Sequence, residues 1–332
     1  MHVGHVRHSF LIAVLLVFAG CGGTGSPAAP STLPAGFVHR GTPVASFSGN
    51  HVRGPLHSVM PSYDAKGWLV FEGDQEQTAV NVYTLSGARK NSAPIGTIKV
   101  QTGCPYGLTM DKKGTLYVAD NCAVGDVEEY PKGSTTESVA ITDGISYPLG
   151  LAMDDEETLY VSNYPAAITE YKHGATSPFQ TITGQGLEDP FGLTLNRHGD
   201  LFIADFGAAQ VFEVAKGTTN VTPLNLEDLV EPIGVAVDKK TGFLWVTDGQ
   251  GNKINVYEPG NLTPHEEITG QGNPYAISTC GVICYPPHPY PAIFESDTST
   301  KAIYGYMEHK YKYDSTLTDG ISLPTGVLVA KP

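Results

Sequence analysis

Aspartate or asparagine recurs at the end of short apolar runs along this chain of 332 residues. Carboxylate and amide oxygens are the ligands that Ca²⁺ and Mg²⁺ prefer, so converging runs could hold a divalent cation in an acidic funnel. The alternative is that each side chain caps its own loop by accepting hydrogen bonds from backbone N–H groups. The residues concerned are Asp120, Asn121, Asn163, Asp205, Asp248 and Asp297.

Aromatic side chains recur at a second position, in the middle of a Pro-x-Gly or closely similar tripeptide. Tyr106, Phe191 and Tyr275 occupy this position in three copies. If the tripeptides lie beside the Asp-bearing loops, the aromatic side chains line the walls of the same funnel. The funnel is then the predicted site for a protein or small-molecule ligand.

The tripeptide itself returns about every 42 residues, which indicates the elements that carry these side chains. A fixed period of this size is typical of a supersecondary unit that stacks on its neighbours to bury a core. The copies begin at Pro105, Pro148, Pro190, Pro232, Pro274 and Pro324.

Each copy contains several short apolar runs separated by turns. In the first copy, the run at 107–111 is followed by a Lys-Lys-Gly turn and by further runs at 116–120 and 127–130. A fourth, weaker run precedes the next proline, and helical periodicity is absent from these repeats. Short runs of this kind, bounded by turn residues, predict antiparallel hairpins. Four strands per repeat predict an all-β fold, a β-propeller of four-stranded blades.

The number of blades depends on how the two ends of the chain meet. The segments 68–73 and 80–83 supply the second and third strands of an additional blade, but 58–64 lacks the Pro-x-Gly pattern. The segment 318–326 nearly repeats 142–150 and is followed by one more strand. We therefore predict that the C-terminal strand completes the first blade and closes a ring of six. The alternative is seven blades, with 58–63 as an inner strand.

Four cysteines lie within or beside the repeats. Cys104 and Cys122 flank the two strands of one hairpin, and the register places them opposite each other, which predicts a disulfide. Cys280 and Cys284 lie in an insertion and predict a small disulfide loop. Zinc ligation is disfavoured because no partner pair of Cys or His stands at zinc spacing.

The amino-terminal segment resembles a bacterial lipoprotein signal. An apolar run at 10–19 is followed by small residues and Cys21, and the run is shorter than the ~20 residues that a membrane-spanning helix requires. We expect 1–20 to be the signal peptide and Cys21 to be lipidated. Residues 21–36, rich in Gly, Ser and Pro, then form a flexible tether, and 37–332 form one propeller domain. The expected location is outside the cytoplasm, anchored to a membrane.

The charge of the chain disfavours one class of partner. The formal net charge is −14, with 20 Lys and Arg against 34 Asp and Glu. Nucleic-acid binding depends on basic side chains that neutralise phosphates, and the sequence contains no basic cluster. Nucleic acid is therefore not an expected partner.

The repeat resembles the NHL repeat, in which Pro-x-Gly is followed by a hydrophobic-x-hydrophobic-Asp segment, a Gly turn and a Leu-Tyr-Val-Ala-Asp segment. The chain is similar to bacterial six-bladed NHL-like propellers from about 58 to 329. This broad group includes interaction modules, metal-dependent lactonases of the gluconolactonase type and streptogramin lyases. The resemblance to the lactonases adds Glu72 to the candidate metal ligands, together with Asn163 and Asp205 or Asp248. The lyases use a histidine base, which has no counterpart at a recurring inner position of this chain.

Three functions remain open from the sequence, one of them a purely structural role in the cell envelope. The first is a lipid-anchored binding or scaffolding module whose ligand lies at the propeller mouth. The second is a metal-dependent hydrolase or lyase with Ca²⁺ or Mg²⁺ in the central funnel. The fold does not decide between them, because propellers carry many activities.

Overall fold

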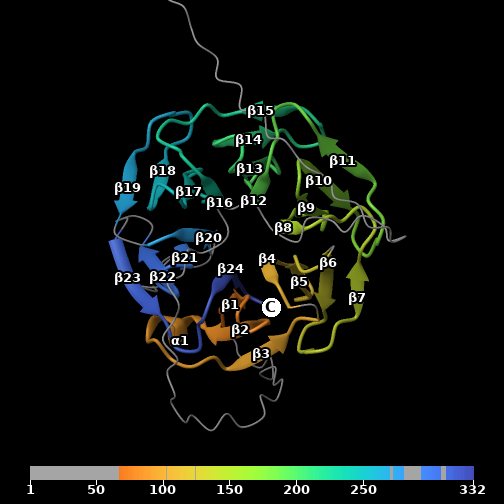
Figure 1. Ribbon diagram of the computed structural model, residues 1–332, viewed down its shortest axis with the longest axis vertical. Helices are drawn as coiled ribbons and strands as arrows, with labels where there is room; N and C mark the ends of the chain where they lie inside the picture. The colour runs from red at the N-terminus through yellow and green to blue at the C-terminus, as the bar shows by residue number, and fades with distance from the viewer. Residues whose placement is uncertain (1–66, 102, 124, 270–271, 280–292, 308–311) are drawn as a thin grey trace, which may run out of the picture. The chain divides into compact units, whose positions relative to one another are not determined.

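The computed structural model describes residues 67–101, 103–123, 125–269, 272–279, 293–307 and 312–332. These residues form six four-stranded antiparallel sheets arranged as blades around one axis (Figure 1). The predicted six-bladed propeller is confirmed, and the alternative of seven blades is wrong.

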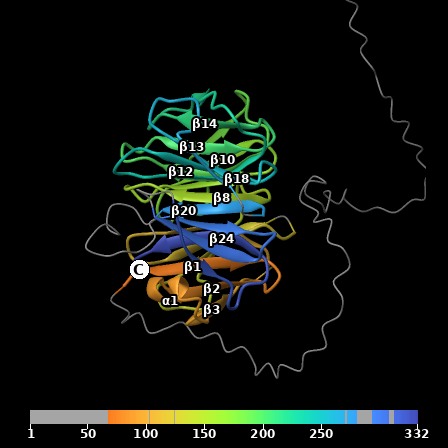
Figure 2. The same cartoon turned by 90° about the vertical axis from the view of Figure 1, so that its left-hand side faces the viewer.

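Blade 1 joins the two ends of the described chain. Its inner strand is β24 (Pro324–Ala330), followed outward by β1 (Leu69–Asp74), β2 (Ala79–Thr84) and β3 (Gly96–Lys99). The strands β24 and β1 lie side by side (Figure 2) and pair from Leu69↔Ala330 to Asp74↔Pro324. The predicted closure by the C-terminal strand is therefore confirmed.

The other five blades each use four consecutive strands, which follow one another outward from the axis in chain order. Blade 2 contains β4 (Pro105–Met110), β5 (Leu116–Asp120), β6 (Asp126–Tyr130) and β7 (Val139–Ile141). Blade 3 contains β8 (Pro148–Met153), β9 (Leu159–Asn163), β10 (Ala167–Tyr171) and β11 (Gln180–Thr183). Blade 4 contains β12 (Pro190–Leu195), β13 (Leu201–Asp205), β14 (Gln210–Val214) and β15 (Val221–Pro223).

Blades 5 and 6 follow the same pattern. Blade 5 contains β16 (Pro232–Val237), β17 (Leu244–Asp248), β18 (Lys253–Tyr257) and β19 (Glu266–Thr269). Blade 6 contains β20 (Pro274–Thr279), β21 (Ile293–Asp297), β22 (Ala302–Met307) and β23 (Lys312–Leu317).

One short helix, α1 (Leu85–Arg89), interrupts blade 1 between β2 and β3. Thr84 caps it, since its hydroxyl accepts the N–H of Gly87 at 2.9 Å. Five residues are too few to show a helical period, so the sequence pattern did not reveal it. No helix in the described part of the chain has the length and apolar character to cross a membrane.

The glycine of each Pro-x-Gly tripeptide allows the inner strands to approach one another. A Cβ atom on Gly107 would lie 2.6 Å from the carbonyl oxygen of Leu149, and one on Gly192 would lie 2.5 Å from that of Ile233. Both distances are shorter than real Cβ contacts, so a side chain at these positions would push neighbouring blades apart. The recurring glycines therefore set the narrow radius of the ring.

The core lies between the blades. Successive side chains of a strand point to opposite faces, so each blade packs on both neighbours. Each second strand carries an aromatic residue three positions before the recurring Asp or Asn, and this side chain packs toward the following blade. The six residues are Phe71, Tyr117, Tyr160, Phe202, Trp245 and Phe294. Below, these side chains are called the interface aromatics.

The ring has two chemically different faces. The clamp face carries the loops that enter the inner strands and the loops between second and third strands. The turn face carries the tight turns between inner and second strands and the loops between third and fourth strands. The recurring Asp and Asn residues belong to the clamp face, because they end the second strands.

Candidate functional site

The recurring aspartates hold the loops of the clamp face together. Asp205 shows the arrangement: its carboxylate accepts the N–H groups of Glu188 and Asp189 from the loop entering β12, both at 2.9 Å. It also accepts the N–H of Ala208, at 3.0 Å, from the loop that follows β13. One buried carboxylate therefore ties two loops of its blade.

The same clamp is built in four other blades. Each of the carboxylates of Asp74, Asp120, Asp248 and Asp297 accepts three backbone N–H groups at 2.6–3.2 Å. All of these aspartates, including Asp205, are 0 % exposed. Charge-assisted bonds of this kind are stronger than bonds between neutral groups, so they hold the loops in place. Asp74 was missed by the sequence analysis, although its position matches the others.

The recurring asparagines also hold loops together, through hydrogen bonds of their side-chain amides. The Asn163 side-chain oxygen accepts the N–H of Ser146 at 2.9 Å, and its Nδ2 donates to the hydroxyl of Thr169. Nδ2 of Asn121 donates to the carbonyl of Pro148 at 3.0 Å, which links blade 2 to blade 3. Among the described residues, each group of three His, Cys, Asp or Glu side chains whose ligand atoms lie within 4.8 Å of one another contains at most one of the recurring aspartates.

Glu72 lies on β1 in the interface between blades 6 and 1, and its side chain is 0 % exposed. Nδ2 of Asn81 donates to its Oε2 at 3.0 Å, whereas Oε1 has no partner among the described residues. Burial, and next the charge of Asp74, raise the pKa of Glu72 well above its ordinary value. Glu295 occupies the same repeat position in blade 6, and its pKa is also raised by burial. Both side chains therefore lie within blade interfaces.

The three recurring aromatic residues pack against one another. The rings of Phe191 and Tyr275 meet edge to face with centroids 5.2 Å apart, and Tyr106 lies 6.0 and 6.3 Å from them. The other three blades place Leu149, Ile233 and Thr325 at this position, and all six side chains are at most 5 % exposed. The aromatic side chains thus form a buried plug across the axis.

The inner strands enclose a central channel with a volume of about 240 Å³. Tyr106 and Phe191, two members of the plug, line one end of the channel. Met153, Lys239 and Thr279 line the other end, toward the turn face. The channel therefore approaches the turn face, while the plug separates it from the clamp face.

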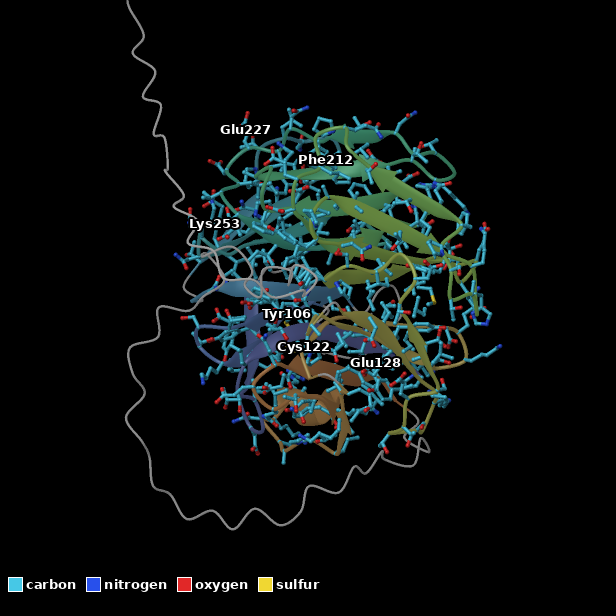
Figure 3. The ribbon with its side chains drawn as sticks, turned by 45° about the vertical axis from the view of Figure 1, so that its right-hand side comes forward. Tyr106, Cys122, Glu128, Phe212, Glu227 and Lys253 are labelled. Carbon is cyan, nitrogen blue, oxygen red and sulfur yellow. A yellow bond between two sulfur atoms is a disulfide. The ribbon has the colours of Figure 1, made fainter. Side chains whose placement is uncertain are left out.

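The predicted disulfide between Cys104 and Cys122 is present, with Cα atoms 5.2 Å apart. The N–H groups of both cysteines donate to Oδ1 of Asp120, so the disulfide and the aspartate clamp join the same two loops. Figure 3 labels Cys122 together with Tyr106 and Glu128. Cys280, Cys284 and the predicted lipidation site Cys21 lie outside the described residues.

An off-axis group of acids lies in blade 2, where Asp120, Asp126 and Glu128 bring one carboxylate oxygen each within 4.8 Å of one another. The N–H of Gln101 donates to Glu128 at 3.0 Å, and the Tyr130 hydroxyl also donates to it. Asp126 Oδ1 has no partner among the described residues. Oxygen donors at this spacing suit a hard divalent cation.

The electrostatics of this acidic group reflect burial and mutual repulsion. Burial, and next the charge of Asp120, raise the pKa of Asp126 to about 6. Burial raises the pKa of Glu128 to about 7 against the opposing hydrogen bond from Tyr130. Asp126 and Glu128 were missed by the sequence analysis because neither type recurs at its position in the other blades.

The two faces differ in their exposed charges. The loops that enter the inner strands, and one second-to-third loop, expose acids on the clamp face: Glu76, Asp143, Glu188, Asp228 and Asp319. Glu227 instead lies beside the loop between β18 and β19, because its N–H donates to the Leu262 carbonyl at 2.8 Å and its carboxylate accepts the Thr263 hydroxyl at 3.1 Å. Basic side chains of the clamp face have partners: Lys253 pairs with Glu267, Lys301 pairs with Glu76, and Nζ of Lys99 donates to the carbonyl of Gln77 at 2.9 Å. The turn face instead exposes lysines among its acids: Lys112, Lys113, Lys132, Lys172, Lys216 and Lys240.

The fold resembles several solved structures at low sequence identity. A chain in a nidogen/laminin complex matches with a TM-score of 0.66 and 16 % identity, over 80 % of this chain and 98 % of that one. A protein of unknown function from Bacteroides caccae matches with a TM-score of 0.57 and 11 % identity, over 80 % and 100 %. Streptogramin B lyase matches with a TM-score of 0.51 and 16 % identity, over 65 % and 69 %.

The sequence matches no protein-family model and no curated protein. Identities of 11–16 % to the solved structures show a shared fold and do not transfer an activity.

Proposed function

We propose that this protein is an exported, lipid-anchored binding module whose clamp face engages a cationic surface of a partner protein. The observation that supports the proposal is that the recurring aspartates hold the loops of their own blades. Their oxygens are bonded to loop N–H groups, and the plug closes the axis beside them. The clamp face therefore offers exposed acidic loops to a partner, instead of a deep funnel.

Charge complementarity defines the partner. Asp143, Glu188 and Asp228 are exposed and form no ion pair among the described residues. A patch with one sign of charge attracts a partner of the opposite sign and increases the rate of association, an effect that salt reduces. The fold likeness to a chain from a nidogen/laminin complex is consistent with a role in protein binding.

Site-specific photocrosslinking in cells tests the proposal. A photoreactive residue placed at Asp143 or Glu188 is expected to yield one discrete protein adduct. The same residue at Lys113, Lys172 or Lys216 on the turn face is the matched control and is expected to yield none. The adduct should weaken when Asp228 and Asp319 are both replaced by Asn. Equal adducts from both faces, or none from the clamp face, would contradict the proposal.

The membrane anchor is tested separately. Replacement of Cys21 by Ser removes the proposed lipidation site, so the protein should leave the membrane fraction. Cys122→Ser is the control for loss of a cysteine, and it should remain with the membrane. Retention of the Cys21→Ser protein in membranes would overturn the proposed anchor.

A metal-dependent hydrolase or lyase is the second candidate, favoured by the acidic group of blade 2. Asp120, Asp126 and Glu128 would hold Ca²⁺ or Mg²⁺, and a bound cation could polarise a carbonyl or lower the pKa of a water. Calorimetric titration of the full-length protein should then show one site that is lost in Asp126→Asn and kept in Asp143→Asn. Absence of binding to either ion would remove this candidate.

A further inference from the structure

A second cavity lies at the interface of blades 4 and 5. Its volume is about 500 Å³, which falls in the ~300–1,000 Å³ range of small-molecule sites. Turns that follow β12, β16 and β18 surround it, so it opens on the turn face, opposite the clamp face. The side chains of Phe202, Glu213, Leu224 and Leu262 contribute to its lining.

Two interface aromatics, Tyr160 and Phe202, are incompletely covered, and Phe202 lines this cavity. At four other interfaces the equivalent side chain is at most 4 % exposed: Phe71, Tyr117, Trp245 and Phe294. Phe202 is only half-buried, and Leu262 at the rim of the cavity is 48 % exposed. The cavity thus presents an aromatic face and apolar side chains to a ligand.

Glu213 is the acidic side chain that determines which ligand the cavity can bind. It pairs in register with Phe202 across β13 and β14, as Glu170 pairs with Tyr160 in blade 3. Nε2 of Gln180 donates to Glu170 at 3.0 Å. Glu213 has no hydrogen bond or ion pair among the described residues. Burial, and next the charge of Asp200, raise its pKa, as expected for a carboxylate that lacks a cationic partner.

The other acids of the cavity already have partners. Glu258 lies 3.2 Å from Nδ1 of His265 and accepts a hydrogen bond from Asn261. Asp238 accepts the N–H groups of Lys240 and Thr241 and so caps its own turn. Glu213 is therefore the carboxylate that is available to a ligand.

We propose that this cavity binds a small primary amine with an aromatic or other apolar body. The apolar body packs on Phe202, and the ammonium group donates to Glu213. Arg197 and Lys239 also line the cavity and disfavour a second cationic group, so the ligand carries a single one. This site uses none of the residues proposed to contact the partner protein, and its test does not depend on that partner.

Calorimetry on the full-length protein at pH 7.5 tests the site with three probes of similar shape. We expect 2-phenylethylamine to bind with a saturable one-to-one isotherm. The neutral 2-phenylethanol and the acid 3-phenylpropionate should bind at least tenfold more weakly, because neither supplies a cation for Glu213. Equal binding of the alcohol or the acid, or no saturable heat at millimolar amine, would overturn the proposal.

Variants identify the residues that bind. Glu213→Gln should weaken amine binding at least tenfold, and Phe202→Leu should weaken it severalfold while keeping an apolar side chain in the interface. Glu170→Gln, the equivalent change in blade 3, is the matched control and should leave binding unchanged. Thermal unfolding of each variant shows whether it is folded. An unchanged dissociation constant in folded Glu213→Gln, or an equal loss in folded Glu170→Gln, would show that Glu213 is not the binding group.

Discussion

The carboxylate of Asp74 accepts a hydrogen bond of 2.6 Å from the N–H of Ser322, 248 positions later in the chain. The N–H of Leu323 donates to the same carboxylate at 3.2 Å, and the N–H of Gln75 donates back to the Leu323 carbonyl. These bonds hold the loop that enters β24 against the end of β1. The clamp that ties two nearby loops in other blades therefore joins distant parts of the chain in blade 1.

Deletion of 324–332 should open the ring. The deletion removes the whole of β24, so β1 becomes an exposed edge strand and the buried faces of blades 6 and 2 lose their contact with the inner strand. We expect unfolding or oligomerisation, measured by light scattering after size exclusion and by thermal unfolding. Deletion of 331–332 alone is the control and should change neither. A monomeric 324–332 deletion with unchanged heat stability would contradict closure by β24.

Asp74→Ala should lower the free energy of unfolding by at least about 3 kcal/mol. It leaves the three N–H groups that Asp74 accepts without an acceptor, and a bond to a charged group contributes ~1.5–3 kcal/mol net. Chemical denaturation measures this loss. Asp143→Ala removes an exposed aspartate from the equivalent loop of blade 3 and should change stability by less than about 0.5 kcal/mol. Equal effects of the two substitutions would argue against the clamp.

The ring closure could be predicted from sequence because it is encoded locally and repeatedly. The segment around Pro324 repeats the one around Pro148, which identifies Pro324 as the start of an inner strand, and blade 1 has, among the described residues, no inner strand of its own before β1. The glycine requirement is equally local, since Gly107 and its equivalents follow each proline. Such features recur in every blade, so periodicity alone identifies them.

Features that belong to a single blade, or that arise where several blades meet, could not be predicted from the repeat pattern. The positions of Tyr106, Phe191 and Tyr275 were predicted, but their mutual contact depends on the radius of the ring, which only the structure provides. Asp126 and Glu128 depart from the repeat, so no periodic signal reveals that they approach Asp120. Glu213 does match Glu170 in the repeat, but its missing partner depends on the neighbouring strand.

Glu128 should make the stability of the protein depend on pH. Its pKa is about 7 in the folded protein against an ordinary 4.5, so the folded state binds the proton more tightly than the unfolded chain. The free energy of unfolding should therefore fall as pH rises from about 4.5 to about 7, by up to about 3 kcal/mol for this group. Asp126, with a pKa of about 6, contributes a fall in the same direction.

Glu128→Gln isolates this contribution, because glutamine keeps a similar shape and does not titrate. Urea denaturation between pH 4.5 and 8 should show a weaker pH dependence in the variant, whose stability relative to the original protein rises with pH. Glu188→Gln, at an exposed position of the clamp face, should leave the pH profile unchanged. Parallel profiles for the original protein and Glu128→Gln would exclude a raised pKa at Glu128.

The plug should contribute strongly to stability. Phe191 is 4 % exposed and contacts Tyr106, Tyr275 and Phe206, with ring centroids 5.2–6.4 Å away. Phe191→Ala should lower the free energy of unfolding by about 3–5 kcal/mol, the usual range for a buried phenylalanine. Phe179→Ala, at a site that is 48 % exposed, is the control and should cost less than about 1 kcal/mol.

A double-mutant cycle between Phe191 and Tyr275 separates ring contact from general burial. The two rings meet at 86°, a geometry in which the edge of one ring approaches the face of the other. Such pairs contribute about 0.5–1.5 kcal/mol beyond the area that they bury. We therefore expect Phe191→Leu and Tyr275→Leu together to destabilise less than the sum of the single changes, by about that amount. Strict additivity in urea denaturation would mean that the two rings stabilise the axis independently, as apolar volume alone.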